Sequence, residues 1–438
     1  MSSILTLPSL IKKEENKELV KHSFISLGVR IGGAAAAFLM NVVVARYLGA
    51  EQSGYFFLAV TTITLLATIG RIGADQTVLR YVSVYGENKE WNKVHAIMNK
   101  IILWSWLPLS LLTVLVCLFS RPISIYLFGK PEMQWPLFWI TLSMPFFGAF
   151  NIHGNALQGL RKVFLSVTCL KILAPLFLMI LVFSFAPKTS SVTSIFYLIA
   201  CLLNFALGYF WWKKSIPSAS TKENFDSSLL WKSCEPLWIV AIMNVITTWG
   251  GQFIAGIYNS PQELAQLAVA RNTTVLVSFI QAAINNVSAP RFAVMYNQGK
   301  MNKLKNYARN TTRLMTLTSL PITLFIWFFP GFIMSMFGKD FTEGIWLLRI
   351  LALGQFVSVI SGSVSYLLIM SGHEKDMKNI RIINAILAVV LALILNPIYG
   401  AVGSAISTAI AIASTNLMGV GLVKKRLGFS TLSLLGFK

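Results

Sequence analysis

Apolar stretches long enough to cross a lipid bilayer return regularly along this chain. A hydrocarbon core of about 30 Å needs roughly 20 helical residues, and a helix satisfies its own backbone groups where lipid offers no partners. Only 12% of the 438 residues are charged and 55% are hydrophobic. We therefore expect an all-α integral membrane protein with about twelve transmembrane helices, at residues 24–47, 55–77, 101–119, 136–158, 163–185, 192–212, 236–258, 266–288, 313–330, 345–370, 380–396 and 399–423.

The basic residues alternate between the two sides of these spans. With the adjoining span ends included, the N-terminus, the even-numbered connections and the C-terminus carry 28 Lys and Arg, whereas the odd-numbered connections carry four. Cytoplasmic loops carry the excess of basic residues, so both termini are expected in the cytoplasm. The net charge of +21 is therefore explained by basic residues that fix the orientation of the spans in the membrane, and nucleic acid is not an expected partner.

The chain repeats itself at an offset of about 211 residues. Colinear matches run from span two to the end of span six and from span eight to the end of span twelve: Arg80 and Arg291, Tyr85 and Tyr296, Lys89 and Lys300, Pro108 and Pro321, Phe128-Gly129-Lys130 and Phe337-Gly338-Lys339. Six spans return the chain to its starting side, so the repeat predicts two parallel six-helix bundles. We assign them to residues 1–222 and 223–438.

Polar residues within the spans should face the protein interior or a water-filled cavity. On span eight they follow steps of three and four, which places them on one stripe. Asn41 on span one and a set on span seven (Asn244, Thr248, Gly251 and Gln252) extend the pattern. The span-eight stripe comprises Arg271, Thr274, Ser278, Gln281, Asn285 and Ser288. The alternative is helix packing, in which such residues hydrogen-bond between helices without a ligand.

Five cations lie inside the proposed spans: Arg30, Arg46, Lys171, Arg271 and Arg349. Snorkelling toward the membrane surface accounts for Arg46 and is an alternative for Arg271 and Arg349. It fails for Arg30 and Lys171, which lie about seven and nine residues into their spans, so these two need a partner or an aqueous cavity. At the cytoplasmic end, Arg71 and Asp75 are four apart and should form an ion pair.

All sixteen acidic residues lie in loops or at span ends. A central cavity with cations and no carboxylates favours an anionic ligand such as a diphosphate, and it disfavours transport of organic cations. The four cysteines and four histidines are scattered, so we expect no metal and no cofactor. There is also no phosphate-binding loop and no catalytic grouping, which makes a transporter the leading class and an enzyme the weaker one.

Four short stretches carry a family resemblance. Residues 45–55 (ARYLGAEQSGY) resemble a signature of bacterial polysaccharide exporters, and they are followed by Gly73-Ala74-Asp75, Leu79-Arg80-Tyr81 and, at the end of span four, residues 157–161 (LQGLR). With the twelve spans, the resemblance covers essentially the whole chain. It points to the O-antigen flippase branch of the multidrug, oligosaccharidyl-lipid and polysaccharide exporter superfamily. The second copy of the signature, at residues 258–263, has lost its glycines.

The resemblance implies a V-shaped pair of bundles in the bacterial cytoplasmic membrane. Such a protein moves an undecaprenyl-diphosphate-linked oligosaccharide from the cytoplasmic to the periplasmic leaflet, with membrane lipid around it and a polysaccharide polymerase or chain-length regulator as a further partner. A multidrug or small-molecule antiporter of the same superfamily is the alternative function. A membrane-embedded polymerase or glycosyltransferase is the third.

We expect the candidate residues to divide into three groups. The cavity cations would attract the diphosphate, the polar cavity residues would hydrogen-bond the sugars, and the entrance residues would gather substrate, although topological anchoring by positive charge is the alternative for Arg71, Arg80 and Arg291. The cavity cations are Arg30, Lys171, Arg271 and Arg349; the polar residues are Asn41, Thr274, Ser278, Gln281 and Asn285; the entrance residues are Arg71, Asp75, Arg80 and Arg291.

Overall fold

The computed structural model describes residues 7–218, 223 and 225–432, and their side chains except at residues 7–27, 30 and 286. Every regular element in this part of the chain is a helix. The first half contains α1 (Leu7–Gly70), α2 (Ala74–Glu87), α3 (Trp91–Leu118), α4 (Ser120–Pro122), η1 (Ile123–Leu127), η2 (Pro131–Met133), α5 (Gln134–Leu142), α6 (Met144–Gly159), α7 (Val163–Val167), η3 (Thr168–Ile172), α8 (Leu173–Phe185) and α9 (Ser190–Ser215).

The second half continues with α10 (Ser227–Tyr258), α11 (Pro261–Asn297), α12 (Met301–Phe328), α13 (Pro330–Ser335), η4 (Lys339–Gly344), α14 (Ile345–Ser361), α15 (Val364–Met370), α16 (Glu374–Tyr399) and α17 (Ala401–Leu427). Both halves therefore consist of long helices joined by short connections. This is the arrangement that the repeat predicts.

The helices account for the twelve predicted crossings. Within the described residues, nine helices are long and apolar enough to span a membrane. One of them, α1, contains two crossings because Gly49 breaks it at φ 72° and ψ 175°. The pair α5 and α6, interrupted at Ser143, and the more polar α12 supply the other two. The expectation of an all-α membrane protein is confirmed.

The two halves repeat their local geometry. Helices α3 and α12 have 28 residues each and carry an internal proline, Pro108 in one and Pro321 in the other. The Phe-Gly-Lys motifs follow their helices in both halves, and Gly129 and Gly338 both adopt positive φ. A residue with a side chain would be strained there, which explains why the motif keeps its glycine in each copy.

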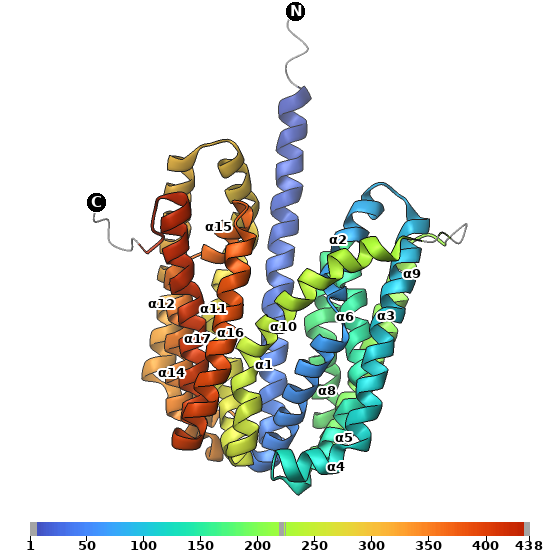
Figure 1. The fold of residues 1–438 in the computed structure, drawn as a ribbon, viewed down its shortest axis with the longest axis vertical. Helices are drawn as coiled ribbons and strands as arrows, with labels where there is room; N and C mark the ends of the chain where they lie inside the picture. The colour runs from blue at the N-terminus through green and yellow to red at the C-terminus, as the bar shows by residue number, and fades with distance from the viewer. Residues whose placement is uncertain (1–6, 219–222, 224, 433–438) are drawn as a thin grey trace, which may run out of the picture.

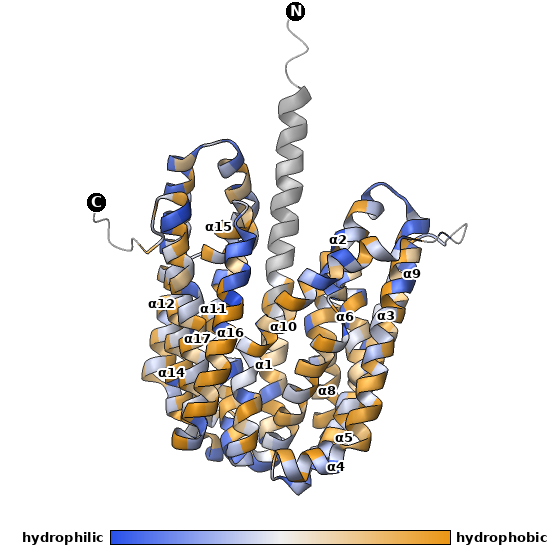
Figure 2. Cartoon of the chain, in the orientation of Figure 1, coloured by the Kyte–Doolittle hydropathy of each residue, from blue (hydrophilic) through white to orange (hydrophobic). Residues whose placement is uncertain are grey.

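Two lobes stand side by side and diverge toward one end of the molecule, with α1 between them (Figure 1). Helix α1 begins, and α9 and α17 end, on the side where the lobes diverge. Hydrophobic residues cover the outer flanks of the lobes, and hydrophilic residues gather near α2 and α15 on this diverging side (Figure 2). We call it the inner end and the opposite side the outer end.

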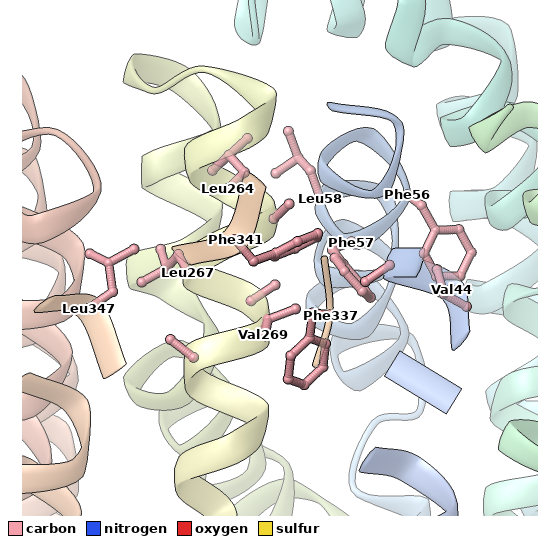
Figure 3. Close-up of a cluster of buried hydrophobic side chains, with 14 of the residues drawn as sticks. Val44, Phe56, Phe57, Leu58, Leu264, Leu267, Val269, Phe337, Phe341 and Leu347 are labelled. Atoms are coloured by element: carbon pink, nitrogen blue, oxygen red, sulfur yellow. The ribbon is translucent and has the colours of Figure 1, made fainter. Parts of the chain in front are cut away.

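A buried apolar cluster joins the halves toward the outer end (Figure 3). Phe57 and Leu58 of α1 lie with Leu264 of α11 and with Phe337 and Phe341 of the second half. The backbones also approach closely, since a Cβ atom on Gly54 would lie 1.9 Å from the carbonyl oxygen of Pro261. We use the term seam for this contact of α1 with α10 and α11.

Helix α10 crosses from one lobe to the other (Figure 1). Near its start, Leu230 is buried in a cluster with first-half residues such as Val78, and the Trp238 indole Nε1 donates a hydrogen bond to the carbonyl of Ile69 at 2.9 Å. Its C-terminal part packs on α16 and α17. The boundary between the halves is predicted after residue 222, and α10, the first helix beyond it, packs against both halves.

Candidate functional site

Arg271 of α11 lies against α10. Its Nη1 donates hydrogen bonds to the carbonyl of Thr248 at 3.2 Å and to Oε1 of Gln252 at 3.3 Å. Its guanidinium carbon lies 3.2 Å from the centre of the Trp249 ring, which places the cation on the aromatic face. Thr248 and Gln252 belong to the polar set predicted on span seven, and the structure brings them to this arginine.

The start of α11 explains the depth of Arg271. Ser260 and Glu263 form a capping box, and Pro261 occupies the first turn, where its missing N–H leaves no bond unmade. The helix thus begins five residues before the predicted span at 266. Arg271 lies ten residues into the helix, about 15 Å along its axis. Its hydrogen bonds to Thr248 and Gln252 direct the guanidinium toward α10.

A second arginine meets α10 one turn earlier. Nη1 of Arg381, in α16, donates a hydrogen bond of 2.6 Å to Oδ1 of Asn244. We call Arg271 and Arg381 the arginine pair. The sequence analysis missed Arg381 because it is the second residue of the predicted span 380–396 and counted as a loop residue. The signal was the polar stripe of span seven, whose first member is its partner.

The arginine pair has no acidic partner among the described residues. The four salt bridges of this part of the chain join Arg71 to Asp75, Lys93 to Glu90, Arg161 to Glu87 and Arg426 to Asp376. No group of three His, Cys, Asp or Glu side chains in it is placed to hold a metal ion. Two cations held by neutral groups create a positive potential that a phosphate or diphosphate would neutralise.

Lys171 lies beside α1. It is exposed and belongs to η3, a π-helical turn. A Cβ atom on Gly33 of α1 would lie 2.9 Å from its Cβ, so the lysine backbone packs one helical turn from position 30. The side chain of Arg30 is outside the described residues. The two deepest predicted cations thus occupy neighbouring stretches of backbone.

Asn41 joins α1 to α11. Its Oδ1 accepts a hydrogen bond of 3.2 Å from Nδ2 of Asn272, the residue after Arg271. The hydroxyls of Thr274 and Ser278 donate to carbonyls of their own helix, those of Arg271 and Val275. Asn41 therefore lies at the seam and bonds to the residue that follows Arg271.

The C-terminal part of the span-eight stripe faces α14 of the second half. Nε2 of Gln281 donates to the carbonyls of Ser358 and Gly362 in and after α14, at 3.1 and 3.2 Å. Asn285 is 7% exposed and its Oδ1 has no hydrogen-bond partner among the described residues. The helix-packing alternative describes Gln281, because its amide is used between helices and not toward the seam.

Arg349 has different surroundings. Its guanidinium lies 5.6 Å from the ring centre of Trp327 and 5.0 Å from that of Trp346, and its Nε donates to the Trp327 carbonyl at 3.2 Å. Trp346 is 61% exposed. These contacts all lie within α12 and α14, so the structure does not bring Arg349 together with the arginine pair. The snorkelling alternative fits this residue.

The entrance residues lie at the inner ends of the two lobes. The predicted ion pair is confirmed: Arg71 Nε lies 2.9 Å from Asp75 Oδ2. The two residues flank the break between α1 and α2, where Ile72 and Gly73 adopt positive φ. Arg80 and Arg291 are exposed and lie 6.0 and 5.7 Å from the ring centres of Tyr81 and Tyr307. Both repeat-related arginines thus stack on a tyrosine of their own half.

The fold and the site define a membrane transporter built of two six-helix halves. A sequence profile described as polysaccharide biosynthesis protein matches residues 19–296, and one described as MatE matches residues 236–398. The first match covers more than half of the chain, so the chain belongs to the polysaccharide biosynthesis protein family, within the multidrug, oligosaccharidyl-lipid and polysaccharide exporter superfamily. Members are multi-pass membrane transporters and not enzymes, as the sequence analysis expected.

Individual relatives agree with this assignment. A probable low-salt glycan biosynthesis flippase, Agl15 of Haloferax volcanii, is 22% identical over 79% of this chain and 71% of its own length. The lipid II flippase MurJ in an inward closed conformation shares the fold with a TM-score of 0.71 at 19% identity, over 92% of this chain and 87% of that one. An inward-facing multidrug resistance transporter of the MATE family gives 0.71 at 14% identity, over 93% and 98%.

Proposed function

We propose that this protein is a flippase that moves undecaprenyl-diphosphate-linked oligosaccharide units from the cytoplasmic to the periplasmic leaflet of a bacterial cytoplasmic membrane, for O-antigen or other surface polysaccharide assembly. The observation that carries the proposal is the arginine pair: Arg271 and Arg381 both donate hydrogen bonds to α10, and neither forms a salt bridge to a described carboxylate. Both side chains are half-buried. An anionic partner forms strong charge-assisted hydrogen bonds with such cations, and a diphosphate supplies two anionic groups.

The surroundings of the pair suit the rest of such a substrate. Lys171 adds an exposed cation beside α1 in the first half, and Asn41, Asn244 and Gln252 offer amides to sugar hydroxyls. The polyprenyl tail remains in lipid, so only the headgroup has to pass between the lobes. We assign the inner end to the cytoplasm, because α1 begins and α9 and α17 end there, and the connections on that side carry the excess of basic residues.

The relatives support the same substrate class. Agl15 is named a probable low-salt glycan biosynthesis flippase, and MurJ is named a lipid II flippase. The multidrug alternative within the superfamily would require an acidic group to attract a cation. The arginine pair has the opposite charge.

The direct test is flipping by the purified full-length protein in proteoliposomes. A fluorescent undecaprenyl-diphosphate oligosaccharide is placed in both leaflets, and a reagent confined to the outside measures how fast the inner pool becomes accessible. We expect rapid exposure with the wild-type protein and slow exposure with Arg271→Ala. The matched control is Arg349→Ala, which removes an arginine–tryptophan contact away from the seam.

Two results would contradict the proposal. One is exposure of the lipid no faster than in protein-free liposomes, together with efflux of a cationic dye. That result would favour the multidrug antiporter. The other is equal loss of flipping in Arg271→Ala and Arg349→Ala. The contact of Arg271 with α10 would then matter no more for transport than an arginine away from the seam.

A further inference from the structure

The two copies of the Phe-Gly-Lys motif each contact the opposite half at the outer end. Phe128 of the first copy packs edge to face on Phe253 of α10, with the ring centres 5.5 Å apart. Phe337 of the second copy packs in the same way on Phe38 of α1, at 5.4 Å. Both motif phenylalanines are buried. The repeated phenylalanines therefore do the same thing, which is apolar packing between the halves.

The lysines of the two copies differ. Lys339 is exposed, whereas Lys130 is only 8% exposed. Nζ of Lys130 donates a hydrogen bond of 2.9 Å to the carbonyl of Phe128 and one of 2.7 Å to the carbonyl of Gly256, in the second half. Gly256 lies in the last turn of α10, where carbonyls lack partners within the helix. Lys130 supplies that partner from the other half, and a cation also suits a helix C-terminus.

A second basic residue makes a related contact. Nε of Arg46 in α1 donates a hydrogen bond of 2.6 Å to the carbonyl of Met336, the residue before Phe337. At the repeat offset of 211, Arg46 corresponds to Ile257 of α10, which is next to Gly256. The two contacts thus occupy equivalent places in the repeat. In both of them the cation belongs to the first half and the carbonyl to the second.

Both contacts require the halves to touch at the outer end. The backbones are close there, since a Cβ atom on Gly256 would lie 2.5 Å from Cδ1 of Leu58 in α1. The lobes diverge at the inner end instead (Figure 1). Burial lowers the pKa of the Lys130 amine, and this cost of removing it from water is offset by the two hydrogen bonds. Separation of the halves would break the bond to Gly256 and the bond of Arg46.

We propose that Lys130 and Arg46 form a two-point latch that holds the outer end closed. Hydrogen bonds from a charged donor are stronger than those between neutral groups, so each contact favours the closed arrangement. Lys130 contributes more, because it is buried while Arg46 is exposed. Lys339 takes no part, although its motif has the same sequence. The latch requires only that the halves separate at this end, whatever substrate the protein moves.

The test is a distance measurement on the purified full-length protein in nanodiscs, without added substrate. Tyr126 in η1 and Phe332 in α13 are 87% and 63% exposed on the outer connections of the two halves. Spin labels at Tyr126→Cys and Phe332→Cys therefore report opening of this end as a longer distance. The background carries Cys117→Ala, since the other three cysteines are buried.

Removal of the latch should favour the open arrangement. We expect Lys130→Met, which keeps an unbranched side chain without the charge, to raise the ratio of the long-distance to the short-distance population about threefold to tenfold. Arg46→Met should raise it less, and the double variant more than either. Lys339→Met is the matched control, because it makes the same change in the other copy of the motif. It should leave the distribution unchanged.

Two results of this comparison would overturn the latch. One is a wild-type distance distribution in Lys130→Met/Arg46→Met. The other is an equal shift in Lys339→Met, because loss of any positive charge at the outer end would then have the same effect.

A label pair within the first half checks that the variants keep their fold. Tyr126→Cys and Phe185→Cys, in α8, should give one unchanged distance in every variant. A change there that matches the change between the halves would assign the shift to distortion of the first half and overturn the latch.

The outcomes are independent of the proposed function. A protein that flips no lipid-linked glycan but shows the shift in Lys130→Met keeps the latch and loses the proposed function. A protein that flips the glycan and shows no shift keeps the function and loses the latch.

Discussion

Arg271 and Arg349 are both arginines on membrane helices of the second half, and both contact tryptophan. Arg271 lies 3.2 Å from the ring centre of Trp249, on the helix that crosses between the lobes, and its neighbour Asn272 bonds to α1. Arg349 lies between Trp327 and Trp346, the second of which is mostly exposed. The difference teaches that the neighbouring helices decide whether a membrane arginine can meet a substrate.

The largest expected effect comes from removing both members of the arginine pair. Arg271→Ala/Arg381→Ala should slow flipping of the diphosphate-linked oligosaccharide roughly 100-fold, because two charge-assisted hydrogen bonds to the substrate are lost, each worth about 1.5–3 kcal/mol. Initial flipping rates in proteoliposomes measure this. A rate within about threefold of the wild type would show that the seam does not bind the headgroup.

A conservative exchange sharpens the same side of the comparison. Arg271→Lys keeps the charge but loses the planar fork that stacks on Trp249 and can bind a phosphate in two places, so we expect a loss of roughly tenfold. The rate should also become more sensitive to salt. Wild-type activity in Arg271→Lys would mean that substrate recognition at this position needs only a positive charge.

A smaller effect should follow from freeing Arg381. Asn244→Leu removes the amide that accepts from its guanidinium, and the misplaced cation should slow flipping about threefold to tenfold. Thr247→Ala on the same helix is the matched control, since the Thr247 hydroxyl donates within α10, to the Met243 carbonyl. Equal rates in the two variants would remove Asn244 from the site.

The smallest effect on transport should come from Arg349→Ala. Flipping should change less than about twofold, while the loss of an arginine between two tryptophans should lower stability by about 1 kcal/mol. Thermal unfolding in detergent, measured beside the flipping rate, separates the two. A large loss of flipping at unchanged stability would indicate that Arg349 contacts the substrate after all.

The sequence predicts the fold well because bilayer thickness and charge asymmetry act on whole segments. The twelve crossings, the two halves and the ion pair of Arg71 and Asp75 all follow from such patterns. The site was harder to predict, since helical periodicity gives the face of a residue and not its partner. Gln281 and Arg271 share a stripe, yet one meets α14 and the other α10.

Two further residues show the same limit. Arg381 counted as a loop residue because hydropathy places span ends only to within a turn, and one turn decides whether a cation faces water or Asn244. Asn259 looked like part of a degraded signature. Only the packing shows that it is 3% exposed, with its amide against Gly400 at the start of α17.

The central claim is that the arginine pair recognises the diphosphate of a lipid-linked glycan. The most direct measurement compares flipping of two lipids with the same oligosaccharide and tail, one with the diphosphate and one without, by wild-type protein and by Arg271→Ala/Arg381→Ala. The account predicts that removing the diphosphate slows the wild type as much as removing the arginines does, and has no further effect in the variant. Equal wild-type rates for the two lipids, or a full additional loss in the variant, would contradict it.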